Sequence, residues 1–563
     1  MTVIDSSDRR DAVRDWIGAA AYVVQPLEPH PPKTGREPDP GAELIVTAPA
    51  TATIGPPLVA DPARKRARRR PSRHTLEVWA VVLLTLVAAF LRLWRLRFGY
   101  AHAVVGYDEG VYFGSSLSLT EGRLPYRDYV LVHPPAITLV FLPFALLAKV
   151  IGTAQAMGLA KIATALAGAA SVPLAARLLW HRGLPAVLLA CGAVAFQDDA
   201  VTSGYAPLLE PWVVLFCLIG VTLVFRGDRL DTSRHLWWGG AVLGIACATK
   251  IWAFAVVLAV MVVCLPARRR VTGYLSGVAV GFLVPVLPFA VLAPTSFVHE
   301  VFVVQLLRTT AERTTAQYRL LHLFSVGPPN ANLPTAGRAW LTAAALVVAL
   351  LLVAAWVPLV RRATALERFA VLSAVLVVGM LFVPGTFYWH YAAFAAPFLA
   401  IAAVLPLTTL RTPARRAWTV VLALCVLALV GTMVHRDLRH YGLHDEHAAF
   451  GAAVPAGACI VTTQSTSVIA DDRYLSGADC PGVLDAFGTA LAYSGGRSPA
   501  ATTLEHPELV ALWIDAVRHA DYVYLVRRVT PTVPPDPALH RYLAAHFHLV
   551  DVAGLAGPLY ARN

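Results

Sequence analysis

The chain has 563 residues, of which 57% are hydrophobic and only 15% are charged. This balance excludes a water-soluble globule and indicates a polytopic membrane protein. The 47 Lys and Arg residues outnumber the 35 Asp and Glu residues, which gives a net charge of +12. Much of the excess lies in RKRARRRPSR, residues 64–73, directly before the first long apolar run, where it suits an anchor beside anionic lipid. The charge therefore predicts membrane lipid, and no nucleic acid, as a partner.

Residues 1–75 are rich in Pro, Ala and charge. They lack the succession of basic stretch, apolar stretch and cleavage site that marks a signal peptide. We expect a disordered cytoplasmic tail that ends in the basic anchor. The N-terminus is then inside the cell, and this sets the sidedness of every later loop.

Apolar runs fill residues 76–434, which we predict to be the transmembrane domain. Arg-rich loops alternate there with loops nearly free of positive charge, as expected when the basic loops face the cytoplasm. The alternation holds if the run at 134–151, which begins with His-Pro-Pro, lies at the outer face instead of crossing. About eleven transmembrane helices result. The basic loops contain Arg182; Arg226, Arg229 and Arg234; Arg268, Arg269 and Arg270; Arg361, Arg362 and Arg368; and Arg411, Arg415 and Arg416.

Two long loops, 99–153 and 294–335, and the C-terminal residues 435–563 are thereby assigned to the outer side. In the C-terminal region the stretches ACIVTTQ, ADYVYLVRR and HFHLVDVAG read as strands, and PELVALWIDAVRHA reads as a helix. This predicts a small extracytoplasmic α/β domain, since about 130 residues can bury a core of their own. Cys459 and Cys480 lie here, and an oxidising compartment permits a disulfide between them without requiring one.

An acidic pair, Asp108 and Glu109, follows the first apolar run at the start of a stretch with helical spacing. Carboxylates in a first turn could simply complement the helix dipole. However, Arg92, Arg95 and Arg97 crowd the outer end of the preceding run, against the inside-positive trend. With His133 and Lys250 assigned to the same face, these residues suggest a site for an anionic group such as a lipid phosphate.

Lys250 interrupts the apolar sequence GIACATKIWAFAVV, where an unpaired ammonium costs about 3 kcal/mol at mid-membrane. We expect it to have a partner, although a lysine that merely extends to the interface is the simpler alternative. Glu210 precedes Pro211 at the mouth of an apolar run and would also be costly unless it faced a polar cavity. The adjacent Asp198 and Asp199 have the pattern of a solvated turn.

Outer-face segments add further candidates. Tyr112 lies one turn beyond the acidic pair, and Tyr388 and His390 open a later apolar run in FYWHYAAFAAP. Anchoring in the aromatic belt explains the tyrosines equally well. The second outer loop contains RTTAERTTAQYRLLH, which could bind phosphate or form an ordinary amphipathic surface helix. Its basic residues are Arg308, Arg313, Arg319 and His322.

These features together resemble the GT-C superfamily of integral membrane glycosyltransferases. Within it, the likeness is to bacterial enzymes similar to protein O-mannosyltransferases and to the lipid A aminoarabinose transferase. The resemblance lies in the order of an acidic pair after the first span, an outer-face His-Pro-Pro, a Glu-Pro in the next outer loop and a lone Thr-Lys after a Gly-rich span. It covers about residues 76–300 and is absent from the C-terminal region.

The resemblance implies a GT-C-like fold in which Asp108 is the catalytic base and Glu109 supports it. It also implies a polyprenyl-phosphate sugar donor, with Lys250 near the donor phosphate. The other candidate phosphate contacts are Arg92, Arg95, His133 and Arg313. Candidates for contact with the sugar or the acceptor are Glu210, Tyr112, Tyr388 and His390. His133 replaces a lysine of the aminoarabinose transferase, and a neutral imidazole would supply less charge there.

The expected activity is transfer of a sugar, with inversion, to a cell-envelope glycan, lipid or protein at the outer face of the plasma membrane. The chain has no GxGxxG fingerprint beside these residues, so a soluble nucleotide-sugar donor is not expected. No cofactor is certain, and a divalent metal ion stays open because relatives differ in this respect. Two other functions also stay open: a transporter or flippase of a lipid-linked sugar, and a membrane scaffold with an extracytoplasmic binding domain.

Overall fold

The computed structural model describes residues 73–94, 96, 99, 101–308, 313–326, 334–438, 447–477, 479–496, 506–526 and 532–563. Residues Pro71–Asn563 form one compact unit. The predicted cytoplasmic tail and its basic anchor lie outside the described residues, except for the few at the start of the first helix. Arg95, a predicted phosphate contact, lies outside them as well.

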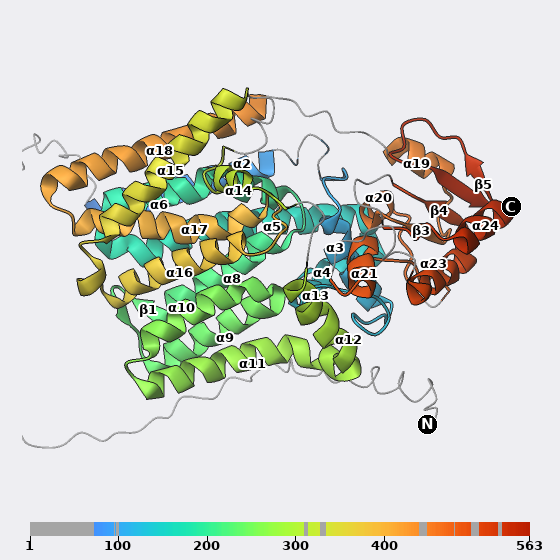
Figure 1. Cartoon of the computed structure of the whole chain (residues 1–563), viewed down its shortest axis with the longest axis horizontal. Helices are drawn as coiled ribbons and strands as arrows, with labels where there is room; N and C mark the ends of the chain where they lie inside the picture. Colours follow the sequence, from blue (N-terminus) through green and yellow to red (C-terminus); the bar gives the residue numbers. More distant parts are fainter. Residues whose placement is uncertain are drawn as a thin grey trace, which may run out of the picture. The chain divides into compact units, whose positions relative to one another are not determined.

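Apolar helices pack side by side in the first three quarters of this unit (Figure 1). Seven of the described helices are long and apolar enough to cross a membrane, or eight if the bent pair α6 and α7 is one span. This multi-helix architecture is as predicted, whereas the number of about eleven spans remains a prediction. The bundle comprises α2 (Arg73–Trp94), α5 (Thr153–Leu179), α6 (Leu184–Phe196), α7 (Asp198–Thr202), α8 (Leu209–Val224), α9 (Ser233–Thr249), α10 (Phe254–Cys264), α11 (Arg268–Leu292), α15 (Thr335–Trp356), α16 (Ala365–Phe382), α17 (Tyr391–Val404) and α18 (Thr412–Leu438).

Short helices cover one end of this bundle. They are α3 (Asp108–Thr120), α4 (Ala136–Ile151), α12 (Pro294–Val298), η5 (His299–Val303), α13 (Val304–Leu306) and α14 (Ala316–Leu323). They come from the two loops that the sequence assigns to the outer face. Helix α4 contains the apolar run that we predicted not to cross, and at 16 residues it is among the shorter apolar helices.

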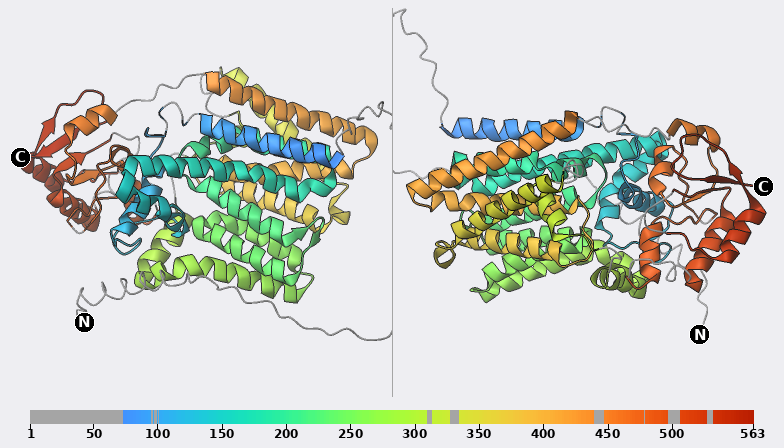
Figure 2. Two further views of the ribbon diagram at one scale, coloured as in Figure 1. Left: turned by 180° about the vertical axis from the view of Figure 1, so that it is seen from behind. Right: turned by 45° about the horizontal axis from the view of Figure 1, so that its top comes forward.

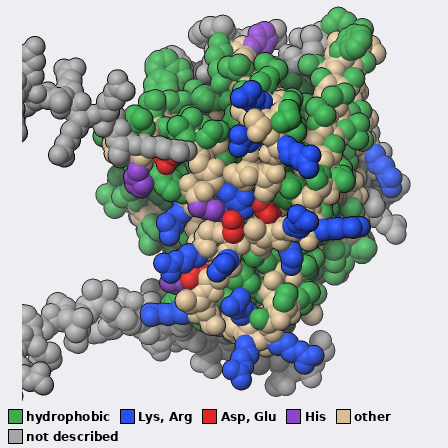
Figure 3. All heavy atoms as spheres, turned by 90° about the vertical axis from the view of Figure 1, so that its left-hand side faces the viewer, with side chains coloured by type: hydrophobic (Ala, Val, Ile, Leu, Met, Phe, Trp, Pro, Cys, Tyr) green, Lys and Arg blue, Asp and Glu red, His purple; other side chains and the backbone are tan. Residues whose placement is uncertain are grey.

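Basic side chains gather at the opposite end of the bundle (Figure 3). The loops there join α8 to α9 through the hairpin of β1 (Phe225–Arg226) and β2 (Arg229–Leu230), α10 to α11, and α15 to α16. Arg182 is largely buried among them, because it pairs with Asp228 and lies 2.8 Å from Glu367. The distribution of charge follows the predicted alternation of loops, and the cytoplasmic assignment of this end remains a prediction.

The C-terminal region combines a sheet with flanking helices. Its described residues form four strands in the order β3-β4-β6-β5, with β3 and β4 parallel and the other neighbours antiparallel. Strands β3 (Ile460–Thr462), β4 (Tyr522–Tyr524) and β5 (Phe547–Val550) lie in the three stretches predicted as strands, whereas β6 (Leu559–Arg562) was not predicted. The helices are α19 (His447–Ala453), α20 (Ser465–Ala470), α21 (Ala486–Tyr493), α23 (Pro507–His519) and α24 (Pro537–His546).

The C-terminal region packs directly on α3 and on the start of α5, and it adjoins this end of the bundle in both views of Figure 2. A Cβ atom on Gly110 of α3 would lie 2.2 Å from the backbone nitrogen of Thr466, so only glycine permits this approach of α20. The Thr466 hydroxyl accepts a hydrogen bond from the Gly110 amide at 3.1 Å and donates one to the Gly106 carbonyl at 2.7 Å. Helix α3 is therefore held between the bundle and the C-terminal region.

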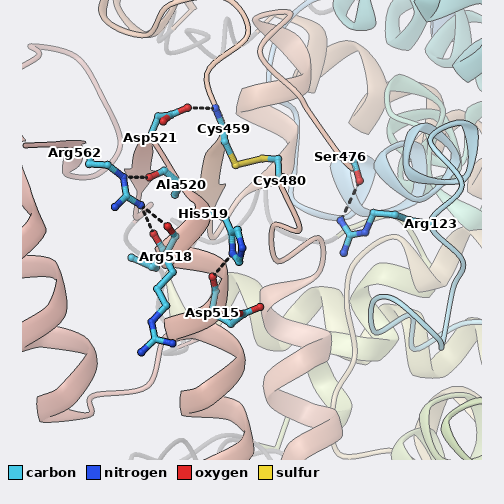
Figure 4. Close-up of a disulfide and its surroundings, with 11 residues drawn as sticks. Arg123, Cys459, Ser476, Cys480, Asp515, Arg518, His519, Ala520, Asp521 and Arg562 are labelled. Carbon is cyan, nitrogen blue, oxygen red and sulfur yellow. Dashed lines mark hydrogen bonds between the residues drawn. A yellow bond between two sulfur atoms is a disulfide. The ribbon is translucent and has the colours of Figure 1, made fainter. Parts of the chain in front are cut away.

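A disulfide joins Cys459, just before β3, to Cys480 in the segment that leads to α21 (Figure 4). The sequence left this pairing open, and the structure contains it. In the same segment Ser476 accepts a hydrogen bond of 3.1 Å from Arg123, which follows α3. The disulfide thus ties the sheet to the segment that packs on α3.

Candidate active site

A cavity of about 410 Å³ is lined by residues of α3, the start of α17 and α21, near the end of the bundle that adjoins the C-terminal region. Its walls come from seven separate parts of the sequence, from residue 105 to residue 491. Predicted site residues make up much of the lining: Asp108, Tyr112, His133, Lys250, Tyr388 and His390. The fold thus brings Asp108 and His390, which are 282 positions apart in the sequence (390 − 108), to one polar cavity.

Asp108 presents the accessible carboxylate of this cavity. It is the first residue of α3, where the free backbone amides of a helix N-terminus stabilise negative charge. Its side chain is 38% exposed, and its Oδ2 lies 3.7 Å from Nε2 of His390. A carboxylate that solvent and ligands can reach is suited to accept a proton.

Glu109 faces away from the cavity and is fully buried. Its Oε1 accepts hydrogen bonds from the amides of Val105 and Gly106 at 2.6 and 3.0 Å. Its Oε2 lies 3.2 Å from Nζ of Lys161, an equally buried side chain that also donates to the Ala103 carbonyl. Glu109 therefore fixes the loop that leads into α3 and does not line the cavity.

Lys250 has the partner that its position predicted. Its Nζ donates to Oε1 of Glu210 at 2.5 Å and lies over the rings of Trp252 and Tyr391, 4.0 and 4.4 Å from their centroids. Nδ1 of His390 is 3.0 Å from the same Glu210 oxygen. Glu210 thus fixes Lys250 and His390 from outside the cavity, whereas those two residues line the cavity itself.

Arg308 supplies a second cation to the cavity wall. Its Nη2 donates to the Tyr388 hydroxyl at 3.1 Å, and its guanidinium lies 5.5 Å from the centroid of the Phe487 ring. Burial alone would lower the pKa of Arg308, but Tyr391, Tyr388 and Asp108 raise it above its ordinary value. The side chain therefore stays charged in contact with the cavity.

His133 lines the cavity as a neutral group. Burial, followed by repulsion from Lys250 and Arg308, lowers the pKa of His133 well below its ordinary value of 6.5. Its ring lies 5.6 Å, centroid to centroid, from that of Tyr112, which also lines the cavity. His133 can thus hydrogen-bond a ligand near neutral pH but adds no positive charge.

The chain matches Glycosyltransferase family 87 over residues 131–384. Its fold is similar to that of ArnT from Cupriavidus metallidurans in the apo state, with a TM-score of 0.54 and 15% identity over 87% of this chain and 98% of that one. ArnT bound to undecaprenyl phosphate gives a TM-score of 0.52 and 16% identity over 86% and 97% of the two chains. The resemblance to the GT-C superfamily is confirmed. No curated protein sequence matches the chain significantly.

The C-terminal region contributes residues to this cavity that the sequence did not reveal. Asp485 caps the start of α21, and its Oδ1 accepts hydrogen bonds from the Tyr107 hydroxyl at 2.6 Å and the Gly488 amide at 2.7 Å. The Phe487 amide donates to the same tyrosine hydroxyl at 2.8 Å. Because Tyr107 immediately precedes Asp108, α21 is linked to the accessible carboxylate.

Two predicted phosphate contacts lie away from this cavity. Arg313 is exposed on the second outer loop, and Arg308 of the same loop lines the cavity in its place. Arg92 is 1% exposed inside the bundle. Charge and approximate position could be predicted for both residues, but the direction of each side chain depends on packing between distant helices.

The prediction of a solvated turn at Asp198 and Asp199 was wrong, because both residues are buried. Oδ2 of Asp199 lies 2.9 Å from Nδ1 of His322, and Asp198 pairs with Arg436 of α18. Both partners lie far along the chain, because His322 is 123 positions after Asp199 and Arg436 is 238 positions after Asp198. Pairing over such distances converts an apparent surface turn into a buried electrostatic cluster.

Among the residues that the structure describes, no group of three or more His, Cys, Asp or Glu side chains has the arrangement to hold a metal ion. Asp108, Asp198 and Glu210 would have had to converge to do so. Instead, Asp198 and Glu210 are each paired with a protein cation.

Proposed function

We propose that this protein is an inverting glycosyltransferase that moves a sugar from a polyprenyl-phosphate donor to a cell-envelope acceptor at the outer face of the plasma membrane. The observation that carries the proposal is the cavity in which the accessible carboxylate of Asp108 shares one space with the cations Lys250 and Arg308. A base and a pair of cations are the groups that such a transfer requires. The undecaprenyl phosphate bound to ArnT, which has the same fold, supports a donor of this class.

In the proposed reaction, Asp108 removes the proton of an acceptor hydroxyl as its oxygen attacks the anomeric carbon. The new carbon–oxygen bond forms while the bond from that carbon to the donor phosphate breaks. The bonding electrons leave with the phosphate, so negative charge accumulates there and Lys250 and Arg308 stabilise it. A single displacement of this kind inverts the anomeric configuration.

The other wall residues position the reactants. Tyr388 holds Arg308 through its hydroxyl, and Glu210 holds Lys250 and His390. His133 remains neutral and can donate a hydrogen bond to the phosphate without adding to the repulsion between the cations. The tyrosine rings and Trp389 provide flat apolar surfaces suited to sugar rings.

We assign the cavity to the outer face because basic loops gather at the other end of the bundle. This orientation lets the polyprenyl tail remain in the bilayer while the phosphate and sugar reach the outer-face helices. The disulfide in the adjoining C-terminal region fits an oxidising compartment.

Purified protein offered a panel of polyprenyl-phosphate sugars tests the proposal. We expect one sugar to be consumed in the presence of membrane acceptors and the product to have the opposite anomeric configuration, measured by NMR coupling constants. Retention of configuration would contradict the single displacement. Movement of the intact lipid-linked sugar across vesicles that lack an acceptor would favour a flippase and overturn the proposal.

A further inference from the structure

A second, much smaller cavity lies within the helix bundle. It has a volume of about 20 Å³ and is separate in its lining from the larger cavity. Arg92, Glu210 and the hydroxyl residues Ser171 and Ser203 are among its walls. Arg92 therefore lies beside the residue that holds Lys250, and not in the cavity where a donor phosphate would bind.

The structure seats the Arg92 guanidinium among backbone carbonyls. Nη1 donates to the Ala88 carbonyl at 3.0 Å and to the Ala195 carbonyl at 3.5 Å, and Nη2 donates to the Val194 carbonyl at 3.5 Å. The latter two carbonyls lie at the end of α6, where the chain bends by 57° before α7. A Cβ atom on Gly168 would lie only 3.0 Å from Nε, so a glycine makes room for this side chain.

Two buried polar atoms beside the small cavity have no hydrogen-bond partner among the described residues. One is Nε of Arg92, a donor, and the other is Oε2 of Glu210, an acceptor. Arg92 is also without a carboxylate at ion-pair distance in the described part of the chain. Buried charged groups rarely remain unpartnered, because water would have solvated them in the unfolded chain.

The size and lining of the small cavity match one water molecule. A water needs about 10–15 Å³ of such space and two to four polar partners. The unpartnered Nε–H can donate to it, the unpartnered carboxylate oxygen can accept from it, and the hydroxyls of Ser171 and Ser203 offer further acceptors. An apolar occupant would leave both charged atoms unsatisfied.

We propose that one ordered water molecule bridges Nε of Arg92 and Oε2 of Glu210, and that Arg92 is a positioning residue that acts through Glu210. The functional part of this inference rests on the proposed function. Oε1 of Glu210 contacts Lys250 and His390. In the proposed bridge, the water links Oε2 of Glu210 to the positive charge of Arg92. A donor phosphate competes with Glu210 for Lys250. Because Arg92 still neutralises the Glu210 carboxylate through the water, Lys250 can turn to the phosphate at a lower energetic cost.

A cryo-EM map of the full chain at a resolution that reveals ordered water tests the bridge without any assay. We expect density within hydrogen-bonding distance of both atoms. A dry cavity, or density that contacts only one of the two atoms, would overturn the proposal. This result does not depend on whether the protein transfers sugar.

A double-mutant cycle with a polyprenyl phosphate as the binding probe tests the positioning role. We expect Arg92→Met to weaken binding about tenfold in the wild-type background and to have little effect when Glu210 is already Gln. Arg92→Lys, which keeps the charge, should recover part of the affinity. Arg182→Met, which removes another largely buried arginine at the opposite end of the bundle, is the control and should bind as the wild type does.

Equal weakening by Arg92→Met in both Glu210 backgrounds would make Arg92 a direct donor contact and overturn the positioning role. Failure of the wild-type protein to bind any polyprenyl phosphate would count against the proposed function, whereas the density between Arg92 and Glu210 would still decide the bridge.

Discussion

Asp108 and Glu109 are neighbours in sequence, yet their carboxylates point to different sides of the α3 N-terminus. Asp108 opens into the cavity, whereas Glu109 is enclosed with Lys161. Successive residues of a helix point about 100° apart, so two carboxylates in one first turn cannot share one environment. The acidic pair was recognisable from the sequence, but the division of roles within it required the position of Lys161 on α5.

Asp108→Asn is expected to lower the rate of sugar transfer at least about a hundredfold, because the amide cannot accept the acceptor proton. Binding of the polyprenyl phosphate should change little, since Lys250 and Arg308 remain. Glu121→Gln, at the exposed other end of α3, is the matched control and should transfer at the wild-type rate. A near-normal rate in the Asn variant would remove the base from the proposed mechanism.

Glu109→Gln should act on stability, since it leaves the buried ammonium of Lys161 without its charged partner. The expected cost is about 3 kcal/mol in the free energy of unfolding. Thermal unfolding in detergent should show a lower Tm for Glu109→Gln than for Glu121→Gln. An unchanged Tm would mean that the Lys161 pair contributes little to the fold.

Arg308 and Arg313 provide a matched pair on one loop, because only Arg308 lines the cavity. Arg308→Ala should raise the donor KM by about tenfold or more, as expected for loss of a charge-assisted hydrogen bond to phosphate. Arg313→Ala should leave the donor KM within twofold of the wild-type value. Equal effects of the two substitutions on the donor KM would mean that the loop attracts the donor phosphate by its overall positive charge, and that Arg308 makes no specific contact with it.

His133 should make the folded protein less stable in mild acid. Its pKa is lowered in the folded state, so below pH 6.5 the unfolded chain binds a proton that the folded chain does not. Stability then falls as pH decreases from 6.5 toward the lowered pKa. Replacing His133 by Gln should flatten this part of the Tm–pH curve, and an identical slope in both proteins would contradict the assignment.

At the scale of elements, η5 connects the second outer loop to the loop that carries His133. Oε2 of Glu300 accepts a hydrogen bond of 2.8 Å from the Leu131 amide, and the Val132 carbonyl accepts one of 2.7 Å from Gln305. His299 lies 2.9 Å from the Ala492 carbonyl of α21. A segment of few residues therefore fixes the spacing between α4, α13 and the C-terminal region.

Glu300 makes this connection sensitive to alkaline pH. Burial, with a smaller contribution from Asp485, raises the pKa of Glu300 to about 8, so the folded chain retains a proton that the unfolded chain loses above about pH 4.5. Stability from this group therefore decreases as pH rises from 4.5 through 8. Glu300→Gln keeps an acceptor for the Leu131 amide and should raise Tm at pH 9 but hardly at pH 5. A Tm difference independent of pH would show that Glu300 is ionised throughout.

The helices and strands could be predicted in large part, because apolar runs and basic loops can be recognised from the local sequence alone. The existence of a partner for Lys250, the shortness of α4 and the strands β3, β4 and β5 follow from such patterns. The short β6 could not be recognised, since its four residues gain their conformation by pairing with β4 and β5. Asp485 was missed for the same reason: only packing of α21 against Tyr107 brings it to the cavity.

At the scale of the whole molecule, the C-terminal region is part of the cavity wall and not a module that can be detached. We expect truncation after Leu438 to abolish transfer. Gly110→Ala is a finer test, because its Cβ would lie 2.2 Å from the Thr466 backbone and separate α20 from α3. Gly379→Ala, with open space around its Cβ, is the control and should remain active. Transfer by the Gly110 variant at the control rate would make the contact dispensable.

The proposed chemistry also requires the cavity and the basic loops to lie on opposite sides of the membrane. Single cysteines at Glu121, near the cavity end, and at Arg269, in a basic loop, both occupy exposed positions. The chain's own free cysteines are largely within the apolar helices, and Cys459 and Cys480 are bonded. A membrane-impermeant thiol reagent should label the cysteine at 121 in intact cells and the one at 269 only after permeabilisation. The reverse pattern would place the donor site in the cytoplasm and overturn the proposed reaction at the outer face.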